Sequence, residues 1–318
     1  MDNIMLDNLF KDKVIIKIEN DQSRARFLTH RGTFHADEVM ATCILLNVYG
    51  NMNICRVNEV INKEALSYDV GFNELDHHQA EFNETRENGI KYASCGLVWR
   101  KYGKQIIKKL NVVDEEAFFN EVDRGLIMDV DRDDNGQALF WEPSFKIQSI
   151  PSIIGNFNPS WNDYENEDEA FLKAIGFANQ VFNNFVRRLE AKFEAKKIIE
   201  EKINESDGQI LILDEYMPWK DVVLSSNNPK AKEILYAVFP SKRGGYNVVA
   251  TPLKQGSYDV KKPFPSIWAG LDEETLKKVS SVKTIRFCHK NLFICACDTL
   301  DDAIKIANIS IKYVGTND

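Results

Sequence analysis

The sequence predicts an α/β fold with two domains: an N-terminal domain built on a parallel sheet and a smaller α+β C-terminal domain, joined by a long helix. In the first half, short strand-like segments alternate with segments of helical periodicity, which is the pattern of a parallel sheet. Between residues 171 and 203, apolar side chains recur at steps of three and four residues, which indicates one helix with a packed face. The 318 residues are enough for two domains.

In the first domain, the expected elements follow one another closely. Strands are expected at 14–18, at 24–30, at 53–57 and in the two segments "SYDVG" and "NELDHH" on either side of Gly71. Helices are expected at 36–49, 92–103 and 114–131. Asp37 and Glu38 favour the first of these helices, because carboxylates complement the positive end of a helix dipole. Residues 143–163 are rich in Pro, Asn and Ser and are expected to form a loop.

The segment after the long helix predicts the second domain. Its expected strands are "QILIL", "ILYAVFP", "YNVVATP", "TIRFCH" and "LFICAC", followed by a helix at "LDDAIKIANISIKY". The expected boundaries are an N-terminal extension over 1–23, a first domain over 24–160, a connecting helical segment over 161–205 and a second domain over 206–318.

Composition excludes several classes of protein. The chain has no run of about 18 apolar residues, so no membrane span is expected. The first 14 residues include acidic side chains and lack the apolar core of a signal peptide. The six cysteines form no C-x-x-C pair, which favours reduced thiols and a cytoplasmic protein. The net charge of −8 argues against broad electrostatic binding to nucleic acid.

Four of the five histidines lie in two short segments beside carboxylates, "THRGTFHADE" and "LDHHQ". Two further segments, "YDVG" and "DVDRDDNG", add aspartates at the ends of a predicted strand and a predicted helix. Side chains at the carboxyl ends of parallel strands converge on the crevice where α/β proteins bind ligands. The four segments supply His30, His35 and Asp37, then Asp69, then Asp76, His77 and His78, and then Asp131 and Asp134.

Imidazole and carboxylate together predict a site for Mn²⁺, Fe²⁺, Zn²⁺ or Mg²⁺, and the absence of cysteine from these segments disfavours a structural zinc. The carboxylates outnumber what one cation needs, which indicates two metal ions that share an aspartate and a bridging hydroxide and act on a phosphoryl group. A calcium loop starting at Asp129 is excluded, because its twelfth position is Phe140 instead of Glu. Each segment taken singly is also compatible with an ordinary surface loop.

Further motifs lie outside the four segments: "YASCGLVWRKYG", "NPSW", "PWK", "AVFPSKRGGYNV" and "PFPSIWAGL". With them, the sequence from about residue 24 to the C-terminus resembles the DHH phosphoesterase superfamily, and within it the melanocyte-proliferating-gene (Myg) family. The resemblance implies a DHH-type catalytic domain with a dimanganese-type site and, as in some members, 3′-to-5′ exonuclease activity on RNA. It implies these roles: the first metal bound by His30 and His35, the second by Asp37, His77 and Asp131, a bridge by Asp69, the scissile phosphate faced by His78, and His77 oriented by Asp76.

This chain departs from the family pattern at three places. Phe72 follows "DVG" where the family usually has Gly, and Arg132 and Asp133 change the usual "DAIDNG". The second change leaves Asp131 and Asp134 as alternative ligands. The third is in the C-terminal domain, which lacks the Gly-Gly-Gly-His substrate motif of other branches. Here the expected substrate-binding residues are Arg243, Arg286 and His289, although His289 could instead be a strand histidine satisfied in the core.

The leading prediction is a cytoplasmic metal-dependent phosphodiesterase, which is a hydrolase. It is expected to use two metal ions, with Mn²⁺ as the leading candidate, and to act as a 3′–5′ exonuclease on single-stranded RNA or short oligonucleotides. One alternative is a small-molecule phosphatase or pyrophosphatase, which the net charge of −8 suits better than a long polyanion. The other is a non-catalytic, metal-containing RNA- or partner-binding protein. No membrane partner is expected, and a homo-oligomer formed through the apolar stripe of 171–203 is left open.

Overall fold

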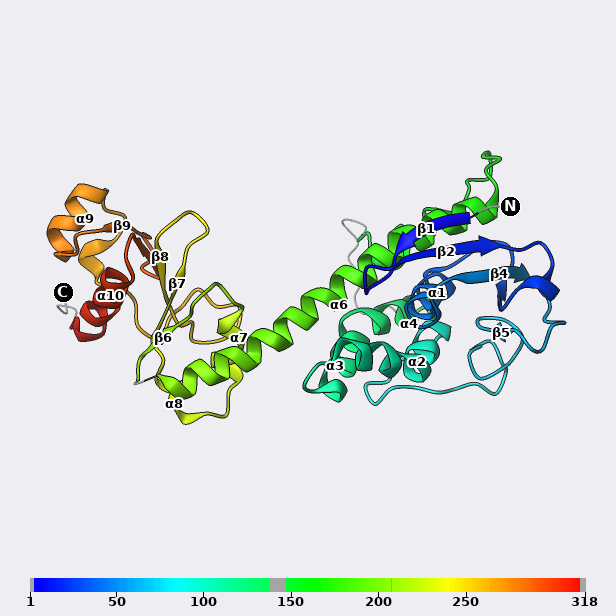
Figure 1. Cartoon of the computed structure of the whole chain (residues 1–318), viewed down its shortest axis with the longest axis horizontal. Helices are drawn as coiled ribbons and strands as arrows, with labels where there is room; N and C mark the ends of the chain where they lie inside the picture. Colours follow the sequence, from blue (N-terminus) through cyan, green and yellow to red (C-terminus); the bar gives the residue numbers. More distant parts are fainter. Residues whose placement is uncertain (1–2, 138–146, 207, 315–318) are drawn as a thin grey trace. The chain divides into compact units, whose positions relative to one another are not determined.

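The structure is a computed structural model that describes residues 3–137, 147–206 and 208–314. The chain divides into two compact units, Met1–Ala191 and Lys192–Asp318, and each contains a five-stranded sheet (Figure 1). The boundary falls inside the 39-residue helix α6 (Glu167–Glu205), which therefore contributes residues to both units. The prediction of a mixed α/β protein is confirmed.

The N-terminal unit is built on a sheet with the strand order β1-β2-β4-β3-β5. Its strands are β1 (Asn3–Asp7), β2 (Lys13–Ile18), β3 (Phe27–His30), β4 (Met52–Val57) and β5 (Leu66–Ser67). Strands β2, β4, β3 and β5 are parallel to one another, and β1 joins β2 as an antiparallel edge. Residues 1–23, expected as an extension, thus supply two strands of the same sheet.

Helices cover this sheet (Figure 1). They are α1 (Ala36–Tyr49), α2 (Ser94–Leu110), α3 (Glu115–Val122), α4 (Met128–Asp134), α5 (Ile150–Gly155) and the first part of α6, with a short 3₁₀ turn at Gln22–Arg24. A π-helical segment (Asp123–Ile127) joins α3 to α4, so the three form one interrupted helical run. The helices α1 and α2 pack against each other.

Two local expectations were wrong. The stretch expected as a loop over 143–163 contains α5, while its residues 143–146 lie outside the described part of the chain. The two strands expected around Gly71 are reduced to the two residues of β5. The reason is the backbone: Asp69, Gly71 and Phe72 all adopt positive φ angles, of 54°, 92° and 52°, which interrupts an extended strand.

Helix α6 closes the core of the N-terminal unit. Its side chains Phe171 and Phe182 are fully buried, which accounts for this part of the apolar stripe by packing inside the unit. Asn179 and Asn183 donate side-chain hydrogen bonds of 2.8 and 3.0 Å to the carbonyl of Asp7. The helix therefore binds the end of β1 through polar contacts in addition to apolar packing.

The C-terminal unit has the strand order β6-β7-β8-β10-β9, in which only β6 and β7 are parallel among the described strands. The strands are β6 (Ile210–Ile212), β7 (Tyr236–Pro240), β8 (Tyr246–Ala250), β9 (Ile285–Cys288) and β10 (Ile294–Cys297). The helices are α7 (Trp219–Ser225), α8 (Pro229–Glu233), α9 (Glu273–Ser280) and α10 (Leu300–Lys312), with a 3₁₀ turn at Ser266–Trp268.

Two buried clusters hold this unit together. One contains Trp268 with Leu276 of α9 and Ile306 of α10. The other contains Trp219 of α7 with Ile199 near the end of α6. Within the described part of the chain, no helix combines the length and apolarity that crossing a membrane requires.

Candidate metal centre

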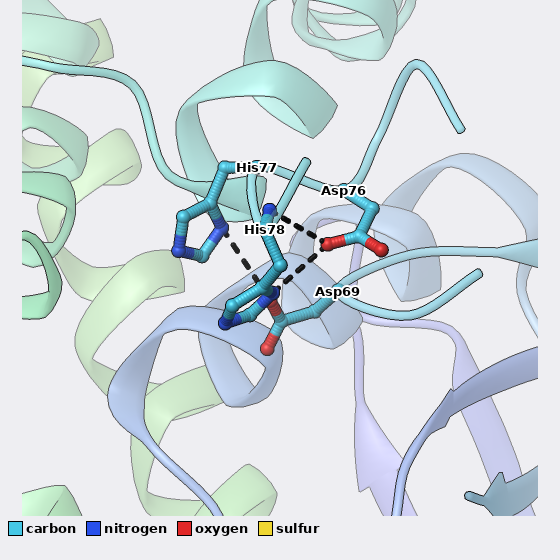
Figure 2. A group of neighbouring side chains, drawn as sticks. All are labelled: Asp69, Asp76, His77 and His78. Atoms are coloured by element: carbon cyan, nitrogen blue, oxygen red, sulfur yellow. Dashed lines mark hydrogen bonds and ion pairs between the residues drawn. The ribbon is translucent and has the colours of Figure 1, made fainter. Parts of the chain in front are cut away.

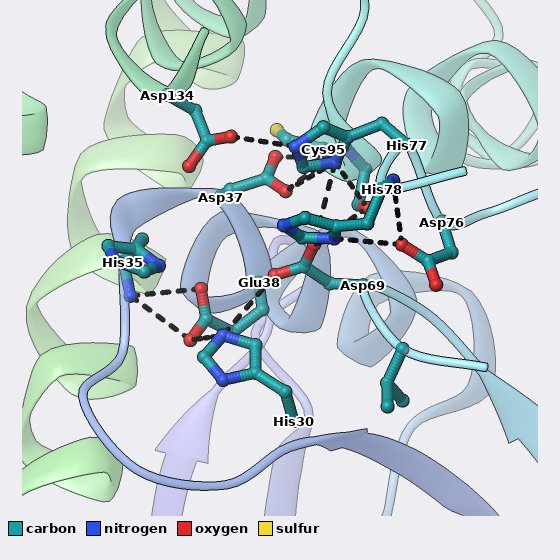
Figure 3. A network of polar contacts seen from close by, with 12 residues as sticks. His30, His35, Asp37, Glu38, Asp69, Asp76, His77, His78, Cys95 and Asp134 are labelled. Carbon is teal, nitrogen blue, oxygen red and sulfur yellow. Dashed lines mark hydrogen bonds and ion pairs between the residues drawn. The ribbon is translucent and has the colours of Figure 1, made fainter. Parts of the chain in front are cut away.

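The histidines and aspartates singled out in the N-terminal unit come together beside the carboxyl ends of its parallel strands (Figure 3). His30 is the last residue of β3, and the loop after it leads to the first turn of α1 with Asp37. Asp69 follows β5 after one residue. The first turn of α2 and the end of α4 complete the site from the helical side.

Asp37 is fully buried and is held by the N-terminus of α2. Its two carboxylate oxygens accept hydrogen bonds from the backbone N–H groups of Ser94, at 3.0 Å, and Cys95, at 2.6 Å. Free N–H groups at a helix N-terminus stabilise a carboxylate. Burial, together with the negative charges of Asp69 and Asp134, nevertheless raises the pKa of Asp37 well above its ordinary value.

Asp69 lies at the centre of the site, and three imidazole rings converge on it: those of His77 and His78 (Figure 2) and that of His30 (Figure 3). One oxygen lies 3.4 Å from Nε2 of His30. The other lies 3.5 Å from Nδ1 of His77 and 3.4 Å from Nδ1 of His78, and it accepts a 3.0 Å hydrogen bond from the hydroxyl of Ser94. A carboxylate with neighbours on all sides has the placement that a bridging ligand requires.

Glu38 is a member of the site that sequence reasoning missed. Its carboxylate lies 2.7 Å from Nε2 of His30 and accepts the backbone N–H of His35 at 3.0 Å. Although burial opposes it, the carboxylates of Asp69 and Glu38 raise the pKa of His30 to about 11. The sequence placed Glu38 in the first turn of the helix predicted at 36–49, where a carboxylate complements the helix dipole, and nothing local indicated its contact with His30.

His77 points toward the helical side of the site. Its Nε2 lies 2.9 Å from a carboxylate oxygen of Asp134, the last residue of α4, and its Nδ1 lies 3.2 Å from the hydroxyl of Ser94. Although burial opposes it, the carboxylates of Asp134 and Asp69 raise the pKa of His77. Asp37, His77 and Asp134 present ligand atoms within 4.8 Å of one another.

Asp131 occupies a different environment. One oxygen accepts the backbone N–H of Gly96 at 2.8 Å, and the other lies 2.7 Å from a guanidinium nitrogen of Arg86. Arg86 also binds Asp123 through two hydrogen bonds of 2.8 and 2.7 Å. Burial raises the pKa of Asp131 to about 7 despite the opposing effect of Arg86. Asp131 is thus partnered by a permanent cation within the protein.

The alternative ligands Asp131 and Asp134 therefore differ in what they face. Asp134 contacts His77 and is the less enclosed of the two. Asp131 also lies within reach of Asp37 and Cys95, but the Cys95 thiol has a pKa raised by burial and is a poor source of thiolate. The geometry favours Asp134 for a metal shared with His77.

Asp76 contacts a different histidine from the one expected. One of its oxygens accepts the backbone N–H of His78 at 3.1 Å and lies 2.9 Å from Nδ1 of the same residue (Figure 2). The other accepts the backbone N–H of Phe72 at 2.7 Å. The expectation that Asp76 orients His77 was wrong, because the ring of His77 points toward Asp134 instead. Phe72 takes part through its backbone, and its side chain is 71% exposed.

The site opens into a cleft of about 630 Å³. His78, whose side chain is 55% exposed, lines this cleft together with His30, His35, Asp69 and the cation Lys63. A volume of this size is typical of pockets that bind small molecules. The cleft therefore gives a ligand access to the imidazole rings and to the central carboxylate.

The residues expected to bind substrate in the C-terminal unit differ in availability. Arg286 lies 3.0 Å from a carboxylate oxygen of Asp298 and donates to the carbonyl of Gly244 at 2.7 Å, so its guanidinium is already engaged. His289 accepts the backbone N–H of Asn291 at 3.0 Å. Arg243 is exposed and, within the described residues, has no carboxylate partner.

The side chains gathered at the N-terminal site have the chemistry of metal ligands. Six carboxylates gather there, namely Asp37, Glu38, Asp69, Asp76, Asp131 and Asp134. Within the described residues, Arg86 is the permanent cation that contacts this group, and it pairs with Asp131. Buried like charges are costly unless protons or cations neutralise them. Imidazole and carboxylate donors fit Mn²⁺, Mg²⁺, Fe²⁺ or Zn²⁺, so the residues present fit divalent metal ions.

The raised pKa values predict how the metal-free protein responds to pH. The folded-state pKa of His30 is about 11 against an ordinary 6.5, and that of Asp131 is about 7 against 3.8. For each group, between its ordinary pKa and its folded-state pKa, the folded chain holds more protons than the unfolded chain. The free energy of unfolding therefore falls as pH rises through these two ranges. In chelator, the Tm is expected to fall from about pH 6 to about pH 8.5.

Added Mn²⁺ is expected to raise the Tm and to reduce this pH dependence, because a metal ion takes over the neutralising role of the bound protons. Thermal unfolding followed by circular dichroism, with and without metal, measures both effects. A Tm that stays level or rises with pH in chelator would contradict the raised pKa values.

Acidic and imidazole groups with this chain order and placement define the class of protein: a metal-dependent phosphoesterase of the DHH-like superfamily. The chain belongs to the MYG1_exonuc family, described as Uncharacterised protein family (UPF0160), whose model matches residues 26–311. The resemblance to the Myg family seen in the sequence is therefore confirmed.

Named relatives match over most of their length. The MYG1 protein of Dictyostelium discoideum is 32% identical over 312 residues, covering 88% of this chain and 94% of the relative. The MYG1 protein C694.04c of Schizosaccharomyces pombe is 28% identical over 317 residues, covering 91% and 98%. The MYG1 exonuclease of Homo sapiens is 26% identical over 324 residues, covering 90% and 85%.

Proposed function

We propose that this protein is a divalent-metal-dependent 3′–5′ exonuclease that hydrolyses phosphodiester bonds of single-stranded RNA or short oligonucleotides. The convergence of three imidazoles on Asp69, within a group of buried carboxylates at an open cleft, carries the proposal. The exonuclease names of the human, mouse and rat relatives support it.

Two metal ions, with Mn²⁺ in first place, would share Asp69. His30, His35 and Glu38 would hold one ion, since their ligand atoms lie within 4.8 Å of one another. Asp37, His77 and Asp134 would hold the other. When bound, such ions lower the pKa of a water molecule and neutralise charge on a phosphoryl group.

The second histidine of "DHH" would act on the substrate. Asp76 fixes His78 through the backbone N–H and through Nδ1, which leaves Nε2 for a phosphate oxygen in the cleft. A histidine held by a carboxylate in this way is oriented before substrate arrives. The cleft has room for about one terminal nucleotide, which favours removal of end nucleotides over internal cleavage.

A second candidate function is hydrolysis of a small phosphate ester or pyrophosphate. The net charge of −8 favours it, as does the lining of the cleft, where Lys63 is the only lysine or arginine among the described residues.

The departures from the family pattern at Phe72 and Arg132, which suggested a non-catalytic protein, lie outside the residues that would bind the metal ions. Phe72 contributes its backbone N–H, and Arg132 pairs with Asp129 at 2.9 Å.

The test is hydrolysis of end-labelled single-stranded RNA by the purified chain with Mn²⁺, beside the same reaction in chelator. We expect stepwise release of mononucleotides, and the position of the label gives the polarity. Pyrophosphate and a dinucleotide are tested in parallel. Turnover of these small substrates without any turnover of RNA would favour the second candidate, and no turnover of any of them would contradict both.

A further inference from the structure

The C-terminal unit contains its own cavity, of about 710 Å³, on the side of the sheet where α7 lies. We infer that this cavity binds one nucleotide of a single-stranded nucleic acid, with the base stacked on Tyr216 and the phosphate held by Lys220, Lys242 and Arg243. The inference deepens the proposed exonuclease function and rests on it for the identity of the ligand.

The first observation is an aromatic surface that faces the cavity. Tyr216 is 58% exposed, although it is a large aromatic side chain. Its ring centroid lies 5.3 Å from that of Phe239, which is buried and supports it from below. A braced, exposed aromatic ring is the platform on which single-stranded bases stack.

The second observation is positive charge without partners. Lys220, Lys242 and Arg243 line the cavity, and within the described residues none of them lies within ion-pair distance of a carboxylate. The lining also includes one acid, Asp221, whose carboxylate lies 3.8 Å from Nζ of Lys192. Three unpaired cations beside an aromatic ring complement a phosphate next to its base.

The turn that carries Lys242 and Arg243 is fixed in place. Gly244 and Gly245, both at positive φ, close the turn between β7 and β8. Arg286 donates to the carbonyl of Gly244 at 2.7 Å, and a Cβ at Gly245 would come within 2.2 Å of the carbonyl oxygen of Cys297. Arg286, first expected to contact substrate, is therefore a positioning residue for the two cations.

A polar group at the base of the cavity suits the rest of a nucleotide. Asn247 on β8 pairs directly with Phe239 on β7, so their side chains lie next to each other on one face of the sheet. Within the described residues, the amide of Asn247 has no hydrogen-bond partner. An amide both donates and accepts, so it can bind the edge of a base or a ribose hydroxyl.

Binding of a fluorescent, phosphorothioate-linked RNA octamer to the full-length, Mn²⁺-loaded chain tests the inference without requiring hydrolysis. Tyr216→Ala is expected to weaken binding about 10-fold, through loss of stacking. The double variant Lys242→Glu/Arg243→Glu is expected to weaken it at least about 10-fold and to reduce the salt dependence of the Kd.

Lys278→Glu is the charge-reversal control outside the cavity, with half the charge change of the double variant, because Lys278 is exposed on α9 and does not line the cavity. Its effect on binding is expected to be less than about 2-fold. Tyr216→Leu keeps an apolar contact with Phe239 but removes the stacking surface, so a loss shared with Tyr216→Ala assigns the effect to stacking. Unchanged affinity in Tyr216→Ala and in the double variant Lys242→Glu/Arg243→Glu would overturn the inference. A loss in Lys278→Glu equal to that in the double variant would also overturn it.

Failure of the proposed exonuclease function and failure of the nucleotide-site inference give different results. If the wild-type chain releases no nucleotides from RNA while the cavity variants still lose octamer binding, the proposed exonuclease activity fails and the nucleotide site stands. If RNA is hydrolysed and the cavity variants bind the octamer like wild type, the cavity is not the site and the proposed function stands.

Discussion

Asp69→Asn is expected to lower RNA hydrolysis by at least about 10³-fold while the chain stays folded. Asp69 is the carboxylate on which His30, His77 and His78 converge, and in the proposed function both metal ions would share its charge. Asn has nearly the same shape, and it tolerates the left-handed backbone at φ 54° better than Ala does. The loss should therefore be one of charge and not of fold.

The same substitution is expected to change the Tm of the metal-free protein little, because it removes both an attraction, between Asp69 and protonated His30, and a repulsion. Asp69 lies beside buried Asp37, whose pKa it helps to raise, so removing one negative charge relieves repulsion. Added Mn²⁺ should raise the Tm of wild type and should have little effect on the variant. Hydrolysis within about 10-fold of wild type, at equal metal concentration, would rule out Asp69 as the shared ligand.

The second prediction separates the two aspartates at the end of α4. Asp134→Asn is expected to lower hydrolysis at least about 100-fold with little change in Tm, because its carboxylate faces His77 in the open part of the site. Asp131→Asn is expected to lower the free energy of unfolding by about 3 kcal/mol, because it breaks a buried contact with Arg86 and places an amide donor against the guanidinium.

Urea unfolding measures the stability of both variants, and hydrolysis by the folded fraction measures their activity. Arg86→Met is the companion variant for Asp131, since it leaves that carboxylate buried and without its cation, and it should destabilise to a similar degree. The reverse pattern, with a stable but inactive Asp131→Asn and an active Asp134→Asn, would show that Asp131 is the metal ligand.

Sequence patterns predicted much of the scaffold, for reasons that the structure makes plain. Helix α1 matches its predicted bounds because its apolar residues and its acidic first turn agree. The long helix was clear because its stripe repeats over many turns. A parallel sheet brings the ends of its strands and the starts of the following helices to one edge. This explains why the sequence could place His30, Asp37 and Asp69 beside one another.

The rest depended on contacts between distant segments. Glu38 looked like an ordinary acidic residue in the first turn of a helix, and only the fold brings it to His30. The segment around Gly71 lost its strands because three residues adopt positive φ, a conformation fixed partly by the hydrogen bond from Phe72 to Asp76. Arg286 resembled a phosphate ligand, but its partners are backbone carbonyls and Asp298, which local sequence does not reveal.

The attachment of β1 to α6 has a consequence for synthesis on the ribosome. The hydrogen bonds from Asn179 and Asn183 to Asp7 join residues 172 and 176 positions apart, and Arg187 reaches Leu9 across 178. At roughly 5–20 residues per second, the first strand waits roughly 10–35 s for its partner helix to be made. During that interval the side chains of Ile4 and Leu6, which face Gly176 of α6 in the folded protein, stay uncovered, so cells that make this protein at a high rate should depend on chaperones that bind this strand.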